Sequence, residues 1–186
     1  RRLHDHDEDV ILEAEHDIRS RLGDRALDFE AMLAVSNIYR AANAVRNRME
    51  REVLGPAGLS WGGFTILFVL WVWGERETGQ LAEDCGLAKG TLSGMLTTLE
   101  KGGLVERSRH SDDGRRVVVR LLDQGLDTIE TVFPEFNRYE AKFTADLAHE
   151  ERREMARLLR RVTATAEVGG APRGLPLSAG APGDRR

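Results

Sequence analysis

The sequence predicts a mainly α-helical fold with one small β-hairpin, and three observations support this. Apolar residues recur every three or four positions through most of the chain, which is the spacing of amphipathic helices. The period changes to two only in residues 104–121, on either side of an Asp-Gly turn. Of the 186 residues 41% are hydrophobic, which suffices for one sizeable core.

The N-terminal third is predicted to hold two helices. Residues 7–22 carry a single apolar stripe among Asp, Glu and Arg, and Gly23 is expected to end this helix. A longer amphipathic helix follows over residues 26–54, and Gly55-Pro56 is expected to stop it.

The central helices follow from capping signals. Ser60 is a suitable N-cap for a helix that starts at Trp61 and is apolar nearly all round, so we expect it to be the core helix. Thr78 is expected to cap a short helix that reaches Cys85. Gly86 is expected to close that helix in the left-handed conformation, and another short helix is predicted over residues 89–101.

The last third begins with the predicted hairpin. Its strands are residues 104–108 and 116–121, joined by a turn at 111–114. Asp123 is expected to cap a long helix running to about residue 147, with a kink at Pro134. A final helix is centred on residues 155–162, and the Gly-, Pro- and Ala-rich sequence from Gly169 is expected to be a disordered tail.

The residues Leu81–Leu96, LAEDCGLAKGTLSGML, predict a helix-turn-helix. This motif needs a small residue where its two helices cross, a Gly at the tight turn and apolar residues on the second helix that point back at the first. Ala82, Gly86, Leu92 and Met95 meet these needs in order.

The opposite face of the second helix is small and polar. Gly90 and Gly94 each disfavour a helix by about 1 kcal/mol relative to Ala, so they require a physical reason. Close approach of the backbone to DNA is one such reason, and packing of a neighbouring helix is the alternative. The other members of this face are Lys89, Ser93 and Thr97.

The hairpin concentrates positive charge in a chain of net charge −4. Residues 101–120 hold six Lys or Arg against three acids, so this segment is +3 and the rest of the chain −7. Arg115 and Arg116 lie at the predicted tip, where Asp113 is placed to hold one of them, and arginine enters a narrow minor groove more readily than lysine. A solvated charged turn is the alternative, but a helix-turn-helix followed by such a hairpin favours a winged helix-turn-helix that binds DNA.

These motifs together resemble the MarR family (multiple antibiotic resistance regulators). The resemblance covers about residues 26–162, and its most specific parts are TGQLAEDCGLAKGTLSGMLTTLEKGGLVERS and SDDGRRVVVRLLDQG. It implies a homodimeric, sequence-specific regulator of transcription, most often a repressor, that binds a pseudo-palindromic operator and in many members is released by a small molecule. Gly94 stands where many members carry Arg or Asn, which removes one base or phosphate contact. The expected DNA-binding residues are Thr78, Gln80, Lys89, Gly90, Thr91, Ser93, Gly94, Thr97, Arg107, Arg109, Asp113, Arg115 and Arg116.

The predicted organisation has four parts. Residues 1–23 form an N-terminal extension with an amphipathic helix, and residues 57–122 form the winged helix-turn-helix lobe. Residues 24–56 and 123–167 form a helical dimerisation region, and residues 168–186 form the tail.

By resemblance, an effector would lie between the dimerisation helices and the DNA-binding lobe, near Trp61, Phe64 and Phe68. The alternative for each ring is a plain core aromatic. The extra N-terminal helix has the layout of the urate-responsive branch, but it contains no Trp, and Thr65 stands where that branch has a carboxylate. Urate is therefore not predicted.

Two other readings of the chemistry stay open. A metal- or redox-responsive regulator of the same fold would use His4, His6 and His16 or the thiol of Cys85. Short acidic His-containing runs are commonly solvated, and a thiol without a basic neighbour is more often packed. The second reading is a winged-helix module that binds only protein.

Several classes are not expected. The sequence has no phosphate loop, dinucleotide fingerprint, metalloprotease motif or nucleophile elbow, so we predict neither an enzyme nor a cofactor or metal site. No apolar run approaches the roughly 20 residues of a membrane span, and no secretory signal precedes the first helix. With a single cysteine this favours the cytoplasm.

Overall fold

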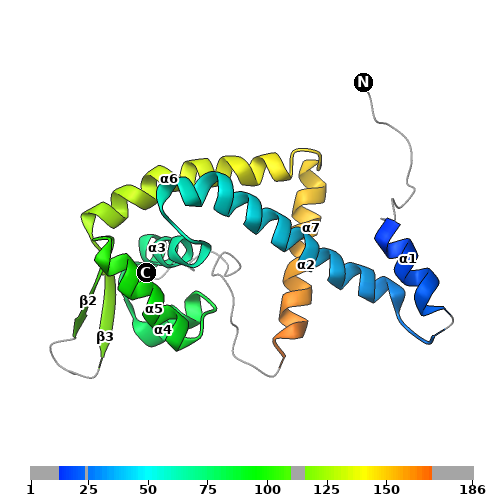
Figure 1. Ribbon diagram of the computed structural model, residues 1–186, viewed down its shortest axis with the longest axis horizontal. Helices are drawn as coiled ribbons and strands as arrows, with labels where there is room; N and C mark the ends of the chain where they lie inside the picture. The colour runs from blue at the N-terminus through cyan, green and yellow to red at the C-terminus, as the bar shows by residue number, and fades with distance from the viewer. Residues whose placement is uncertain (1–12, 24, 110–115, 169–186) are drawn as a thin grey trace, which may run out of the picture. The chain divides into compact units, whose positions relative to one another are not determined.

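The structure is a computed structural model that describes residues 13–23, 25–109 and 116–168. The described residues form seven α-helices and one three-stranded antiparallel sheet, which confirms the predicted mainly α fold with a small β-hairpin (Figure 1). The chain divides into two compact units, Arg1–Val45 and Arg46–Arg186.

The first unit holds α1, Glu13–Leu22, and most of α2, Phe29–Met49. Gly23 follows α1 with a left-handed φ of 57°, as expected of a helix-ending glycine. The Asp28 carboxylate accepts a hydrogen bond of 2.9 Å from an N–H in the first turn of α2 and so caps that helix. The predicted start of α1 at residue 7 lies outside the described residues.

A buried carboxylate fastens α1 to α2. Glu15 is only 6% exposed, and the side-chain amide of Asn37 donates to it at 2.7 Å. Arg40 forms an ion pair with the same carboxylate at 3.5 Å. A buried charge needs such partners, so these contacts fix the register of the two helices.

The end of α2 differs from the prediction. The helix does not continue regularly to residue 54 but widens into a π-helical turn, η1, Glu50–Leu54, followed by a 3-10 turn, η2, Gly55–Ala57. The Gly55 N–H donates to the Glu50 carbonyl, and a Cβ at Gly55 would lie 2.7 Å from that oxygen. The Glu50 carboxylate also accepts a bond of 3.3 Å from the backbone of Trp61, so the wide turn ties α2 to the next helix.

The core helix is α3, Trp61–Trp73. Ser60 caps it as predicted, because its hydroxyl accepts a bond of 3.1 Å from the N–H of Gly63. Nine consecutive residues, 62–70, are buried, which places this helix inside the second unit. No single helix of the described residues has both the length and the apolar character to cross a membrane; one bent helix pair, 29–57 with 61–73, meets those criteria by length and composition only.

The hairpin belongs to a sheet that has one strand more than predicted. Strands β2, Val105–Arg109, and β3, Val117–Leu121, form the predicted antiparallel pair, and β1, Arg76–Glu77, joins the other edge of β3. β1 lies directly before the short helix, where no strand was predicted. It exists because residues 76 and 77 pair with residues 119 and 118 of β3, which is a tertiary contact.

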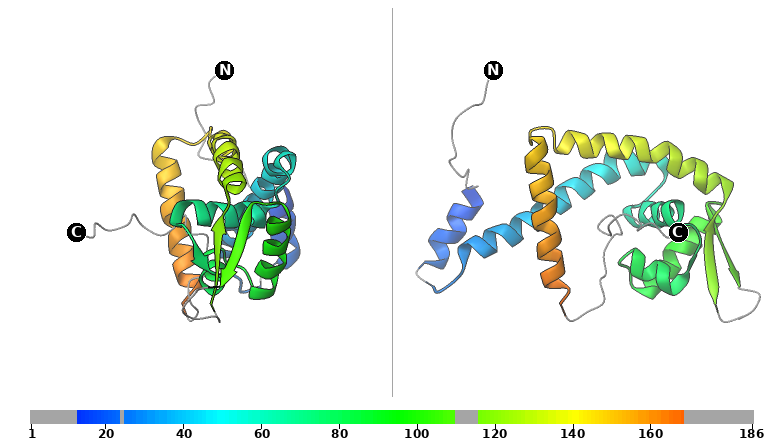
Figure 2. Two further views of the ribbon diagram at one scale, coloured as in Figure 1. Left: turned by 90° about the vertical axis from the view of Figure 1, so that its left-hand side faces the viewer. Right: turned by 180° about the vertical axis from the view of Figure 1, so that it is seen from behind.

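Two long helices complete the second unit. α6, Asp123–Phe143, continues through Pro134 without interruption and ends four residues before the expected position. Leu122, not Asp123, is its N-cap residue, and α7, His149–Ala166, follows. Figures 1 and 2 show α3, the helix-turn-helix and the hairpin grouped at one end of α6.

Candidate nucleic-acid interface

The predicted helix-turn-helix is formed by α4, Thr78–Asp84, and α5, Lys89–Lys101. Glu77 is the N-cap residue of α4 and Thr78 is its first residue, so the expected cap at Thr78 is displaced by one position. The small residue Ala82 is buried at the helix crossing, and Gly86 turns the chain with a φ of 64°.

The inward face of α5 follows the predicted spacing. Leu92, Leu96 and Leu99 are buried, and Met95 is half-buried against the core. Because these side chains lie on one side of the helix, the remaining side is left to solvent.

The solvent-exposed side of α5 is open at its two glycines. A Cβ built at Gly90 or Gly94 would meet no atom within 4 Å. Packing of a neighbouring helix on these glycines therefore has no support among the described residues. We define the outer face of α5 by six of its exposed residues: Lys89, Gly90, Thr91, Ser93, Gly94 and Thr97.

A cavity of about 240 Å³ lies beside the outer face, between the start of α4, α5 and the hairpin. Its rim carries the hydroxyls of Thr78 and Ser93 and the cations of Lys89 and Arg107. The structure therefore brings together four of the expected DNA-binding residues from three elements. Gln80, on the exposed side of α4, instead donates to Asp84 at 2.8 Å.

The tip of the hairpin, residues 110–115, lies outside the described residues, and with it Asp113 and Arg115. Arg109 ends β2 and is exposed. Arg116 precedes β3 and forms an ion pair of 3.0 Å with Glu77, whose side chain is about half exposed. This pair ties the base of the hairpin to the strand that precedes α4.

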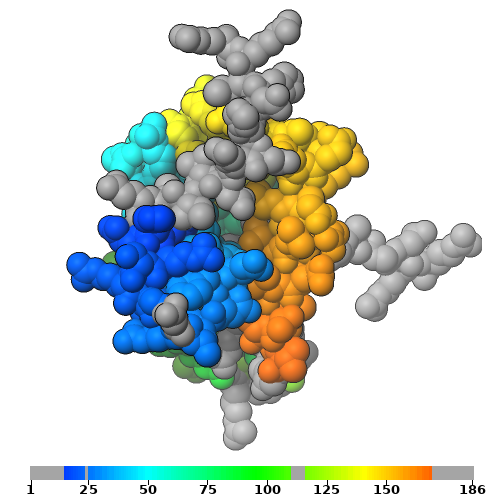
Figure 3. Space-filling model, turned by 90° about the vertical axis from the view of Figure 1, so that its right-hand side faces the viewer, coloured from blue at the N-terminus to red at the C-terminus, as the bar shows by residue number. Residues whose placement is uncertain are grey.

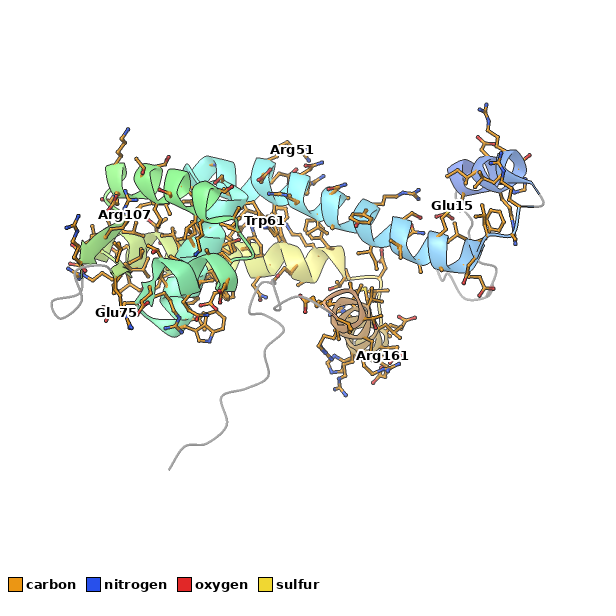
Figure 4. All side chains as sticks on the ribbon, turned by 90° about the horizontal axis from the view of Figure 1, so that it is seen from below. Glu15, Arg51, Trp61, Glu75, Arg107 and Arg161 are labelled. Atoms are coloured by element: carbon orange, nitrogen blue, oxygen red, sulfur yellow. The ribbon has the colours of Figure 1, made fainter. Side chains whose placement is uncertain are left out.

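Arg107 is held by α5. Its Nε donates to the Glu100 carboxylate at 2.8 Å and its backbone N–H donates to the same carboxylate at 2.9 Å. The hydrogen bond from Arg107 lowers the pKa of Glu100 and raises the pKa of Arg107. Figure 4 shows Arg107 between α5 and the hairpin.

Glu77 and Glu100 were not predicted from the sequence as site residues. A signal existed for Glu100, because it lies in the last turn of α5, where the helix dipole disfavours an acid unless a cation faces it. Glu77 carries no comparable signal, since its partner is 39 residues away in the chain.

The expected effector residues serve as core aromatics in the described contacts. Phe64 stacks on Phe136 of α6 with ring centroids 4.3 Å apart, and the ring centroids of Phe68 and Phe133 are 5.4 Å apart. Trp61, at the edge of this cluster, is half-buried and is labelled in Figure 4. An effector site at Trp61, Phe64 and Phe68 remains a prediction.

Cys85 is a packed thiol at the end of α4. Burial, and then the negative charge of Asp84, raise the pKa of Cys85 to about 12. A thiol with such a pKa is almost entirely protonated at neutral pH and is a poor redox sensor. His16 is exposed on α1, while His4 and His6 lie outside the described residues.

Comparison with known proteins identifies relatives with the same motifs. Residues 59–117 match the model of the MarR family. The uncharacterized HTH-type transcriptional regulator YwaE of Bacillus subtilis is 38% identical over 164 residues, which cover 87% of this chain and 95% of YwaE. The HTH-type transcriptional regulator MgrA of Staphylococcus aureus is 27% identical over 128 residues, which cover 68% of this chain and 84% of MgrA.

Solved structures show the same architecture. The organohalide-sensing regulator RdhR-CbdbA1625, in its 2,4-dichlorophenol-bound form, has a TM-score of 0.68 at 25% identity and covers 82% of this chain and 85% of that chain. The PcaV regulator of Streptomyces coelicolor, in complex with its natural ligand, has a TM-score of 0.65 at 26% identity. The match covers 76% of this chain and 99% of the PcaV chain. These relatives are transcription regulators rather than enzymes.

Proposed function

Since this chain belongs to the MarR family of transcription regulators, we propose that it is a cytoplasmic, sequence-specific repressor that binds a pseudo-palindromic operator as a homodimer. Each subunit places α5 in the major groove and the hairpin on the flanking backbone and minor groove. The residues that carry these contacts are Thr78, Gln80, Lys89, Gly90, Thr91, Ser93, Gly94, Thr97, Arg109, Asp113, Arg115 and Arg116.

The outer face of α5 is the observation that carries this proposal. Its two glycines reduce helix propensity and support no packing among the described residues, so intramolecular structure does not account for them. Close approach of a duplex does account for them, because a base edge or phosphate can reach the helix backbone where no Cβ intervenes. Lys89 at one end of the face supplies a cation, and no ion pair within the described part of the chain engages it.

A gel shift with the DNA upstream of the chain's own gene tests this function. Binding with no other protein present supports the proposal and excludes a module that binds only protein. In the same assay, Ser93→Ala should change the base preference at one position of each half-site. An equal loss across all sequences would instead assign Ser93 to the phosphate backbone.

The homodimer rests on an apolar helix face without a partner in the described chain. None of the α7 side chains is buried there, and four apolar residues of one face are 40–46% exposed: Met155, Leu158, Leu159 and Val162. Figure 3 shows α7, in orange, at the surface. Burying this face against a second copy removes apolar area from water, which is the main favourable term in stable association.

Charge on this face should break the dimer. Leu158→Glu would bury a carboxylate in the interface, and the protein should elute as a monomer in size-exclusion chromatography with light scattering. Ala164→Glu, on the other side of α7, is the matched control and should stay dimeric. A dimer that survives Leu158→Glu would place the interface elsewhere.

We also propose a small-molecule effector at the edge of the aromatic cluster near Trp61. The ligand-bound structures of RdhR-CbdbA1625 and PcaV support this, because both regulators share the fold of this chain. An effector acts by favouring one separation of the two α5 helices over another, which moves them out of register with the grooves. The direct test is tryptophan fluorescence against a library of small aromatic acids and phenols, comparing the wild type with Trp61→Phe, because the chain has three tryptophans.

A further inference from the structure

One arginine of the hairpin is bound to two successive turns of α5. The Arg107 backbone N–H and Nε bond to the Glu100 carboxylate at 2.9 and 2.8 Å, and one terminal nitrogen bonds to that carboxylate as well. The same terminal nitrogen donates to the Thr97 hydroxyl at 3.2 Å. Both charged side chains are 28% exposed, so water screens this pair less than a fully exposed one. We call these three residues the wing brace.

The wing brace is a second attachment between α5 and the hairpin. The first is the Gly102–Gly103 link, which the Leu104 N–H secures by donating to the Leu99 carbonyl at 3.0 Å. The other strand of the hairpin, β3, is held separately by its pairing with β1. The wing brace adds a direct restraint between β2 and α5, which that pairing does not supply. Arg107 pairs with the fully buried Val119 of β3, so a restraint on Arg107 applies to the whole hairpin.

The position of the Glu100 carboxylate on α5 calls for a physical reason. Ser93, Thr97 and Glu100 follow one another on one stripe of α5, so the acid continues the outer face that we propose meets DNA. An acid there repels phosphates and also faces the negative end of the helix dipole. Both effects disfavour an acid at position 100. A carboxylate can, however, hold the Arg107 guanidinium by several charge-assisted bonds, which a neutral side chain cannot do.

We propose that Glu100 is a positioning residue for DNA recognition, which acts through Arg107 to fix the angle between α5 and the hairpin. This rests on the proposed function. In this proposal Arg107 is a structural cation and not one of the phosphate contacts, which differs from the role expected for it from the sequence. Removing the acid at position 100 weakens specific binding even though it makes the DNA-facing surface more positive.

The test compares two duplexes at several salt concentrations. One is the highest-affinity duplex that the full-length wild-type protein selects from random DNA, and the other is a scrambled duplex of the same length and composition. With Glu100→Gln, the ratio of the two affinities should fall about tenfold, the size of one mismatched base pair. Affinity for the scrambled duplex should not fall. Arg107→Lys keeps the cation but not the multiple bonds, so it should lower the ratio equally, and the double variant should fall no further.

Glu106→Gln is the matched control. Glu106 lies on β2, the strand that carries Arg107, and its carboxylate accepts a bond of 2.7 Å from Arg120 across the hairpin. Glu106→Gln therefore removes the same charge as Glu100→Gln without changing a contact to α5. Its affinity ratio should match that of the wild type. The proposal is overturned if Glu100→Gln raises or preserves the affinity ratio while the slope of log affinity against log salt concentration steepens by about 0.9. That result would mean that Arg107 had become a phosphate contact. Additive losses in the double variant would also overturn it. A wild-type protein with no preferred duplex would instead refute the proposed function itself.

Discussion

Replacing Gly94 of α5 by alanine should make the protein more stable and its DNA binding weaker. Gly94 lies in the helix interior, where Gly is less favourable than Ala by about 1 kcal/mol. The added Cβ meets no atom within 4 Å, so no clash offsets this gain. For a protein of this size about 1 kcal/mol corresponds to a rise of roughly 2–4 °C in unfolding temperature. Gly90 lies in the first turn of α5, so Gly90→Ala should gain less.

The loss of DNA binding has a separate origin. In the proposed complex the α5 backbone approaches the duplex at these glycines, so a methyl group there displaces a base-edge contact. We expect specific affinity to fall about tenfold, comparable with one mismatched base pair. The two effects therefore have opposite signs, and a single substitution shows both.

Two assays at one protein concentration measure the pair of effects. Thermal unfolding followed by circular dichroism gives stability, and it must be compared at fixed concentration because the proposed dimer makes unfolding concentration-dependent. Fluorescence anisotropy with a selected duplex gives affinity. Thr131→Ala, on the exposed side of α6, is the control: it should raise stability slightly and leave affinity unchanged. A lower unfolding temperature for Gly94→Ala would reveal a packing partner for this face, and unchanged affinity would remove the face from the DNA interface.

Three further predictions follow from particular contacts. Gly125→Ala should destabilise the protein by about 1–3 kcal/mol in urea unfolding, since its Cβ would lie 2.0 Å from the Leu104 carbonyl oxygen; a neutral effect would contradict the close packing of α6 on this turn. Native Cys85, with a pKa of about 12, should be thiolate in only about one molecule in 100,000 at pH 7 and should react with Ellman's reagent far more slowly than in the unfolded chain; rapid reaction would reopen a redox role. The Tyr139 hydroxyl lowers the pKa of Glu52, which adds stability above the ordinary carboxyl pKa and loses it as the pH falls through the lowered one. Tyr139→Phe should therefore lower the unfolding temperature at pH 7, and its difference from the wild type should narrow below pH 4.5; a pH-independent difference would assign the effect to packing alone.

The helix-turn-helix was predictable because its signals are local. Ala82, Gly86 and Leu92 act within one pair of short helices, and their chemistry requires the turn and the buried face wherever the pair is placed. The Ser60 cap and the fully apolar α3 were predictable for the same reason.

The features that were not predicted depend on distant partners. β1 has only two residues and exists through pairing with β3, so no period-two pattern marks it. The π-helical turn at Glu50–Leu54 depends on Gly55 and on the contact to Trp61, which periodicity does not report. The pair of Arg107 and Glu100 joins a strand to a helix across a Gly-Gly link, and the sequence gives only the indirect hint of an acid at a helix C-terminus.

Selection of bound duplexes from random DNA tests the central claim most directly. The account predicts enrichment of an inverted repeat whose half-sites are centred about 10 base pairs apart, as two α5 helices related by a two-fold axis require. Recovery of no enriched sequence at moderate ionic strength, or of a single unrepeated site, would contradict it.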